Sequence, residues 1–201
     1  MHTQHQAHGA FAGRSTRRYD FMARRLMRGF YRRIAEDVAL LAPNGADILD
    51  VGTGPGVLLT ETARRRPDVS ITGIDPSADM IAAATRNIEP YPGRVHARIG
   101  SAAEVPSDDA AFDLVVTSLS LHHWDDVAAS VAELARVLRP GGQIVVFDLA
   151  RAPFGELDAA ADAHSGLSSA ACHTTIGTGV PHVRRIERHV LHATAEAAQP
   201  R

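Results

Sequence analysis

The sequence predicts an α/β fold in which a doubly wound, mostly parallel β-sheet carries helices on both faces. Between residues 46 and 149, short apolar runs of β type alternate with segments of helical periodicity, which is the pattern of right-handed βαβ units. The runs are almost continuously apolar, as expected of strands covered on both faces. A glycine-rich turn follows the first run. The 201 residues suffice for one such domain.

The N-terminal part divides into a tail and a helix. Residues 1–12 are polar and contain three histidines but no apolar anchor, so we expect a flexible tail. From Tyr19 to Leu41, apolar residues recur every fourth position, which predicts an amphipathic helix. We interpret the remainder as one domain, residues 13–201, with three parts: a helical segment (19–45), a core (46–150) and a short C-terminal part (151–201).

The first strand and the turn after it predict a ligand site. Ile48, Leu49 and Val51 form the strand, and Gly52-Thr53-Gly54-Pro55-Gly56 follows. Glycines allow a sharp turn and a close approach of backbone to ligand. A helix expected over residues 57–66 would present free N–H groups there. The pattern is G-x-G-x-G, and Val57 occupies the third glycine position of the dinucleotide fingerprint.

Two acids restrict the kind of ligand. Asp50 precedes the turn, where it would repel a pyrophosphate and attract an ammonium group. Asp75 ends the second strand, where a carboxylate can accept both hydroxyls of a ribose. The turn therefore suits a nucleoside that carries an amino acid better than a dinucleotide.

The remaining elements follow in order along the chain. Ser77 is the expected N-cap of the second helix, and Asp125 is expected to begin the helix after the fourth strand. The expected ranges are a helix at 78–87, strands at 95–99, 113–118 and 143–149, a helix that Pro140-Gly141-Gly142 ends, a helix at 154–164, and two strands within 180–196.

Four sequence blocks together resemble a known family. They are Asp50-Val51-Gly52-Thr53-Gly54-Pro55-Gly56, Gly73-Ile74-Asp75, Phe112-Asp113-Leu114-Val115-Val116 and Leu138-Arg139-Pro140-Gly141-Gly142. In this order they resemble the Rossmann-like class I S-adenosylmethionine-dependent methyltransferases, in the branch that includes the ubiquinone/menaquinone-type enzymes. The resemblance covers roughly residues 46–150. It implies S-adenosylmethionine as cofactor and a small organic acceptor methylated on oxygen, carbon or nitrogen.

The resemblance also implies particular residues. Met80 would lie against the adenine, and Ser101 stands where the family often has an acid that holds the adenine amino group. The segment before the first strand would act as a lid on the cofactor. The implied cofactor-binding residues are Tyr19, Asp50, Gly52, Thr53, Gly54, Gly56, Asp75, Pro76, Met80, Ser101, Ala102, Ser118 and Leu119.

His122 and His123 are the candidate catalytic residues. They follow the fourth strand, at the carboxyl edge where open α/β sheets bind ligands. An oxygen or carbon acceptor usually needs deprotonation, and an imidazole is a suitable general base near neutral pH. Asp125 could orient one of the two rings. Alternatively, one histidine only packs within the loop.

Composition leaves two other function classes open. Residues 14–33 hold eight arginines and one acid, although the net charge is −2, so a nucleic-acid methyltransferase is one alternative. The acidic remainder argues against it, and the arginines could instead meet an anionic membrane surface. A methyltransferase-like scaffold that binds cofactor without turnover is the other alternative.

Several chemistries and locations are disfavoured. The chain has no lysine for a Walker-type phosphate site, no G-x-S-x-G nucleophile elbow, and in Cys172-His173 only a pair without zinc spacing, so we expect no metal site. No apolar run approaches the ~20 residues of a transmembrane helix. The single cysteine is compatible with a reducing compartment, and we expect a cytoplasmic protein whose oligomeric state the sequence leaves open.

Overall fold

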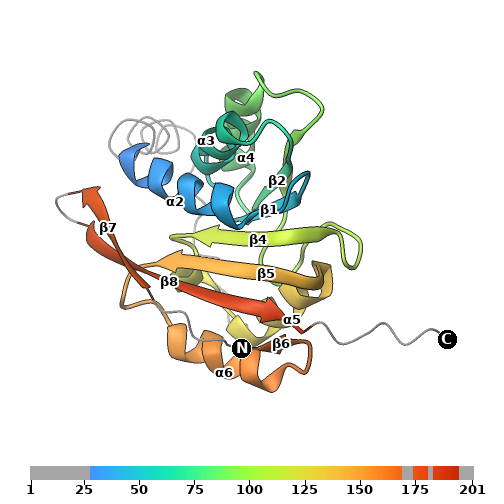
Figure 1. Cartoon of the computed structure of the whole chain (residues 1–201), viewed down its shortest axis with the longest axis vertical. Helices are drawn as coiled ribbons and strands as arrows, with labels where there is room; N and C mark the ends of the chain where they lie inside the picture. Colours follow the sequence, from blue (N-terminus) through green and yellow to red (C-terminus); the bar gives the residue numbers. More distant parts are fainter. Residues whose placement is uncertain (1–27, 169–173, 181–182, 195–201) are drawn as a thin grey trace, which may run out of the picture.

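A computed structural model of the chain describes residues 28–168, 174–180 and 183–194 (Figure 1). The expectations for the tail and for Tyr19 lie outside these residues. The described helices are α2 (Arg28–Leu41), α3 (Val57–Arg65), α4 (Ala78–Ile88), η1 (Leu121–His123), α5 (Val127–Val137) and α6 (Phe154–Ala163). The strands are β1 (Asp47–Val51), β2 (Ser70–Asp75), β3 (Val95–Ile99), β4 (Phe112–Ser118), β5 (Leu138–Asp148), β6 (Leu167–Ser168), β7 (Thr174–Val180) and β8 (Val183–Ala193).

The strands form one sheet in the order β3-β2-β1-β4-β5-β8-β6, with β7 also paired to β8. Strands β1 to β5 are parallel to their neighbours, and β8 runs antiparallel to β5. The chain builds outward from β1 to β3, then returns to place β4 beside β1. This reversal makes the carboxyl end of the β1–β4 pair the topological switch point, where sheets of this kind bind ligands.

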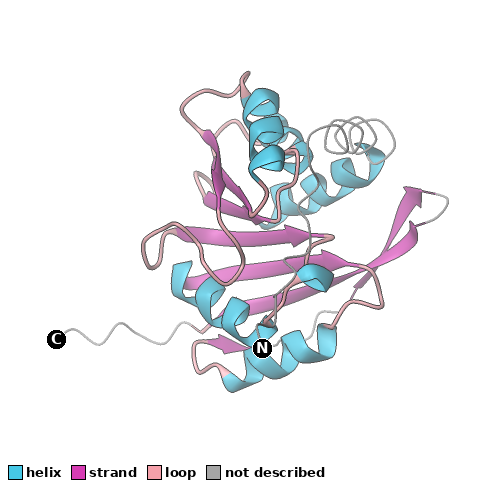
Figure 2. Ribbon diagram, turned by 180° about the vertical axis from the view of Figure 1, so that it is seen from behind, coloured by secondary structure: helices cyan, strands magenta, loops and turns pink. Residues whose placement is uncertain are grey.

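Helices cover both faces of the sheet, as the sequence predicts (Figures 1 and 2). On one face, Phe30, Ile34 and Val38 of α2 are fully buried in a cluster with α3 and with Ile48 of β1. On the other face, α5 and α6 pack on a second cluster that includes Leu49 and Val51. Alternate residues of β1 therefore point into different cores, which explains the unbroken apolar run.

Two helices begin at side-chain caps. The Ser77 side chain accepts a hydrogen bond from the Met80 amide at the start of α4, which confirms the expected cap. Asp126, and not Asp125, caps α5 by accepting from the Ala129 amide (2.9 Å). Both are acceptable cap residues, so the sequence alone did not separate the two neighbours.

Two strand boundaries differ from expectation. β5 begins at Leu138, which pairs with Phe112, and the register then shifts before Leu114. Pro140-Gly141-Gly142 thus lies in an irregular part of a strand, where a missing N–H and a positive φ at Gly141 are tolerated.

The final strand pair spans 174–193 instead of lying within 180–196. The β7–β8 pair continues past the carboxyl end of β5, where Asp148 pairs with Glu187 (Figure 1). Charged residues in β8 are tolerated because Ile186 and Val190 are buried, whereas the charged Glu187 and Arg188 stay partly exposed.

Candidate active site

Two loops meet at the switch point. The glycine loop (Gly52–Gly56) follows β1, and the histidine turn, defined here as Ser118–Trp124, begins at the end of β4. A Cβ atom placed on Gly52 would lie 2.3 Å from Ser120 Oγ. The loops are therefore in direct contact, and only glycine at position 52 permits it.

The glycine loop is tied to β2 by its backbone. The amides of Gly52 and Thr53 both donate to the Ile74 carbonyl at 2.9 Å. Gly52, Gly54 and Gly56 have φ values of 71°, 53° and 76°, a region that side chains with a Cβ rarely adopt. The loop geometry thus depends on glycine at all three positions.

Asp50 lies beneath this loop and is almost completely buried. Its Oδ2 accepts a hydrogen bond from Thr53 Oγ1 at 2.6 Å, whereas its buried Oδ1 has no hydrogen-bond partner among the described residues. Burial raises the pKa of Asp50 to about 7; the Thr53 hydrogen bond opposes this, and the charge of Asp75 adds to it. A nearby cation would stabilise the ionised form.

Asp75, at the end of β2, holds the glycine loop from the other side. Its two oxygens accept from the amides of Gly54 and Ser77, both at 2.9 Å. Burial raises the pKa of Asp75 in spite of these two hydrogen bonds. A carboxylate has about four lone-pair positions, so each oxygen retains capacity for a further donor such as a ribose hydroxyl.

The residues implied for the adenine lie next to Asp75 in the chain. Pro76 is exposed and Met80 is buried on the first turn of α4. Ser101 forms an isolated bridge with Glu104, and Ala102 between them is buried. Ser101 directly follows Gly100, whose amide donates to the Asp75 carbonyl at 3.3 Å. This hydrogen bond places Ser101 and Ala102 near the carboxyl end of β2.

Ser118 and Leu119 begin the histidine turn. Ser118 is buried at the end of β4, and Leu119 has a positive φ of 54°, which is uncommon for a residue with a large side chain. The Leu119 amide donates to the Phe147 carbonyl of β5 at 2.8 Å. The chain thus turns sharply away from the sheet directly before the two histidines.

His122 is held by a residue that the sequence reading missed. Its Nδ1 lies 2.8 Å and 3.0 Å from the two oxygens of Asp148, the last residue of β5, and its amide donates to the same carboxylate at 3.2 Å. Asp148 is fully buried, and the His122 side chain is 24% exposed. Asp148, and not Asp125, therefore orients this ring.

His123 occupies a different environment. It is exposed, and its ring centroid lies 4.0 Å from that of His122. Partial burial lowers the pKa of His123, and the neighbouring His122 lowers it further, against an opposing effect of Asp148. Of these two histidines, His122 is the one that the structure pairs directly with a carboxylate.

These residues fit the cofactor that the sequence implies. Asp50 and Asp75 are two buried, mutually repelling carboxylates with raised pKa values, and Asp50 keeps an unpartnered oxygen among the described residues. Such a pair favours a ligand that brings a cationic amine and hydroxyl donors. No cluster of three potential metal ligands occurs in the part of the chain that the structure describes.

Comparison with known proteins agrees with this geometry. Residues 48–142 match a family model described as a methyltransferase domain. The ubiquinone/menaquinone biosynthesis C-methyltransferase UbiE of Geotalea daltonii is 36% identical over 143 residues, which are 68% of this chain and 60% of the relative. The demethylmenaquinone methyltransferase of Thermus thermophilus is 36% identical over 69% of this chain and 64% of that protein.

The solved structures extend the likeness to the whole fold. A crystal structure of a protein described as an S-adenosyl-L-methionine-dependent methyltransferase from Methanococcus maripaludis superimposes with a TM-score of 0.73 at 19% identity, over 98% of this chain and 100% of that one. Residues 48–142 therefore resemble a methyltransferase domain, and the fold is shared with the Methanococcus maripaludis protein. The chain spans less than two thirds of the length of the two relatives named above.

Proposed function

We propose that this protein transfers a methyl group from S-adenosylmethionine to a small organic acceptor. The observation that carries the proposal is the placement of an oriented imidazole, His122, on a turn that touches a glycine loop flanked by two buried acids. The fold alone would not suffice, because one fold hosts many functions. The site adds groups suited to holding the cofactor and to accepting a proton.

The residues of the glycine loop and its two acids hold the cofactor in this proposal. Asp75 accepts the ribose hydroxyls, and the ionised form of Asp50 balances the charge of the amino group. Met80 and Ala102 line the adenine side, and Ser118 and Leu119 line the methionine side. When bound, S-adenosylmethionine supplies an electrophilic methyl group on a sulfonium. Rigid placement of donor and acceptor is the main contribution that a protein makes to such a displacement.

His122 takes up the proton that the methyl-receiving molecule loses. A carboxylate only accepts hydrogen bonds, so Nδ1 facing Asp148 carries the hydrogen and Nε2 carries the lone pair. The positive charge that His122 gains on protonation is balanced by the buried Asp148. An acceptor with an ionisable O–H, such as a phenol, fits this arrangement.

The location of the protein in the cell is also a proposal. In the described part of the chain, every helix is too short or too polar to cross a membrane. The single cysteine keeps a cytoplasmic location as our expectation. Contact with a membrane surface through the arginine-rich N-terminal segment would suit a lipid-like acceptor.

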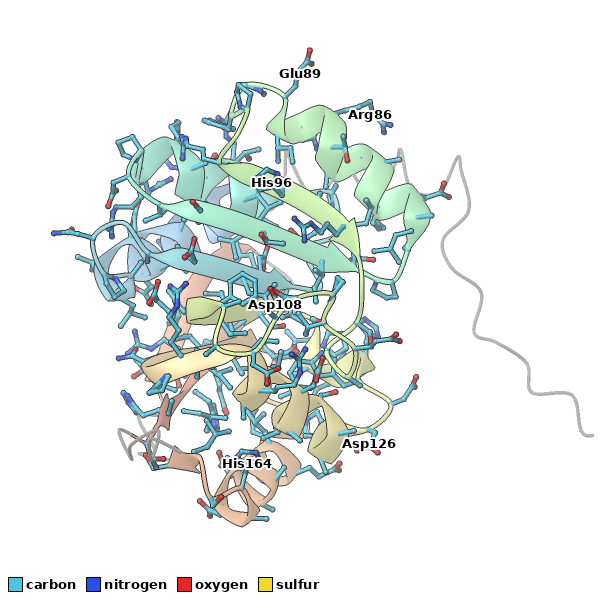
Figure 3. The ribbon with its side chains drawn as sticks, turned by 90° about the vertical axis from the view of Figure 1, so that its right-hand side faces the viewer. Arg86, Glu89, His96, Asp108, Asp126 and His164 are labelled. Carbon is cyan, nitrogen blue, oxygen red and sulfur yellow. The ribbon has the colours of Figure 1, made fainter. Side chains whose placement is uncertain are left out.

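Calorimetry tests the cofactor. We expect S-adenosylmethionine and its demethylated product to bind, and NADH not to bind. Asp75→Ala should weaken binding by about 1.5–3 kcal/mol, the range for hydrogen bonds to a charged group. Asp108→Ala is the matched control, because Asp108 is exposed on the loop before β4 (Figure 3). Tight NADH binding, or equal affinities of the two variants, would overturn the assignment.

A screen of acceptors tests the transfer itself. Incubation with cofactor and a panel of phenols, alcohols and amines should yield a product heavier by one CH₂ group. If no phenol, alcohol or amine yields a product although the cofactor binds, the protein is better explained as a scaffold that binds cofactor without turnover.

A further inference from the structure

The contact between Gly52 and Ser120 is unusually close. A Cβ at position 52 would lie 2.3 Å from Ser120 Oγ and 2.6 Å from Ser120 Cβ. The serine side chain thus occupies the notch that glycine leaves in the backbone of the cofactor loop. Since Gly52 has a positive φ of 71°, the notch exists only in this conformation of the loop.

Trp124 holds that serine from the opposite side. Its indole Nε1 donates to Ser120 Oγ at 3.2 Å, and the ring packs against the core cluster beneath α5. The indole is therefore anchored in the domain, while its N–H fixes the side chain that fills the notch.

Between Ser120 and Trp124 the chain forms the short helix η1, which carries both histidines. The His123 amide donates to the Ser120 carbonyl (2.9 Å), and the Trp124 amide donates to the Leu121 carbonyl (3.1 Å). The His122 ring is held separately by Asp148. A shift of Ser120 would thus be transmitted through a single tight turn to His122.

We propose that Ser120 and Trp124 form a clasp that couples the conformation of the glycine loop to the position of His122. In this role both are positioning residues: they touch neither proton nor methyl group but set the position of the histidine turn on the glycine loop. The inference rests on the proposed function, because the loop is taken to bind the cofactor. Occupation of the loop then changes the surroundings of Trp124.

Trp124 is the only tryptophan of the chain, so its fluorescence reports on the clasp alone. Titration with S-adenosylhomocysteine should change the emission of the full-length protein with the same midpoint that calorimetry gives. In Ser120→Ala, we expect calorimetric binding to persist about 3–10-fold weaker, as for loss of one neutral hydrogen bond, with an emission change at most half as large. Ser70→Ala, an exposed serine that begins β2, should behave as the wild type.

A double-mutant cycle gives a second test of the clasp. Trp124→Phe removes the same hydrogen bond from its other end, so the effects of Ser120→Ala and Trp124→Phe on calorimetric affinity should not add. Both variants should lower kcat more than they raise KM for the acceptor, because His122 is displaced. Additive effects, or calorimetric binding without any emission change, overturn the clasp. Absence of calorimetric binding in the wild type would overturn the proposed function first.

Discussion

At the scale of single residues, the pairing of His122 with Asp148 decides what the site can do. The carboxylate is fully buried and accepts from the ring, from the His122 amide and, at 2.7 Å, from the Leu149 amide. Three donors on one carboxylate fix its position. His122 is therefore held in one tautomer with one orientation, which a free surface histidine is not.

Replacement of the pair should separate proton transfer from binding. His122→Ala should lower turnover by roughly 10²–10⁴-fold, the usual contribution of a general base, with cofactor affinity unchanged. Asp148→Asn should lower turnover by less, on the order of 10–10²-fold, since an amide can stabilise the wrong tautomer of His122. His123→Ala is the control, and steady-state kinetics provides the measurement. Equal turnover of all three variants would make the pair structural.

Asp50 predicts how stability depends on pH. Burial raises its pKa from the ordinary value of 3.8 to about 7 in the folded chain. Between these values the folded protein binds more protons than the unfolded chain, so this residue makes stability fall as pH rises. Asp50→Asn should remove the effect and gain stability over the wild type toward pH 8, on the order of 1–3 kcal/mol.

Urea unfolding at pH 5 and pH 8 measures this difference. Saturating S-adenosylmethionine should flatten the pH dependence of the wild type, because the ammonium group stabilises the ionised carboxylate. Parallel stability profiles of the two proteins would show that burial does not hold the proton on Asp50.

The sequence predicts residues best where chemistry and chain position coincide. Asp50 and the glycines could be named because they adjoin one turn, and Asp75 because it ends the next apolar strand. Asp148 could have been found by the same rule, as an acid that ends a buried parallel strand. The clasp could not, because the notch at Gly52 and the indole bond of Trp124 depend on how two loops separated by β2 to β4 are packed together.

At the scale of elements, Arg66 joins the end of α2 to the connection between α3 and β2. Its guanidinium donates to the carbonyls of Ala39, Ala42 and Pro43 at 2.7–2.8 Å and pairs with Asp68 at 2.8 Å. These carbonyls lie at the C-terminal end of α2, where the last helical turn lacks its own donors. One side chain after α3 thus satisfies the end of the preceding helix.

Arg66→Ala should lower the free energy of unfolding by about 1–3 kcal/mol, since buried or half-buried carbonyls lose their donors. Arg66→Lys should rescue little, because an ammonium group cannot reproduce the planar fork. Arg86→Ala is the control, since Arg86 points outward from α4 (Figure 3). Chemical denaturation gives the three values, and a loss no larger than that of Arg86→Ala would contradict the capping role.

Elements with clear start and stop residues were predicted almost to the residue. Gly56 and Ser77 mark α3 and α4, and the apolar runs mark β1 to β4. The predicted boundaries were wrong where pairing between strands overrode the local sequence signals. For example, β5 begins at Leu138 and runs through a Pro-Gly-Gly segment because Leu138 pairs with Phe112. β7 was missed because its threonines and glycines gain strand structure only by pairing with β8.

At the scale of the whole molecule, α2 belongs to the core. Phe30, Ile34 and Val38 are completely buried against the sheet. Arg33 also donates to the Gly177 carbonyl of β7, and Arg188 of β8 pairs with Asp37 at 3.2 Å. The helix therefore joins β1 to the far β7–β8 pair across one face of the sheet. A lid role stays a prediction for the segment before it.

Two truncations separate the core function of α2 from that lid. Removal of residues 1–41 deletes three fully buried side chains, whose burial contributes about 1.5–3 kcal/mol each. This is a large part of the 5–15 kcal/mol that stabilises a domain, so cooperative unfolding should be lost. Removal of residues 1–27 keeps α2 and should leave the melting midpoint within a few degrees of the full chain. If the lid prediction holds, this second variant binds S-adenosylhomocysteine more weakly by calorimetry while still melting cooperatively. If the 28–201 chain binds with wild-type affinity, residues 19–27 do not belong to the cofactor site. If the 42–201 chain melts cooperatively, α2 is not required for the core.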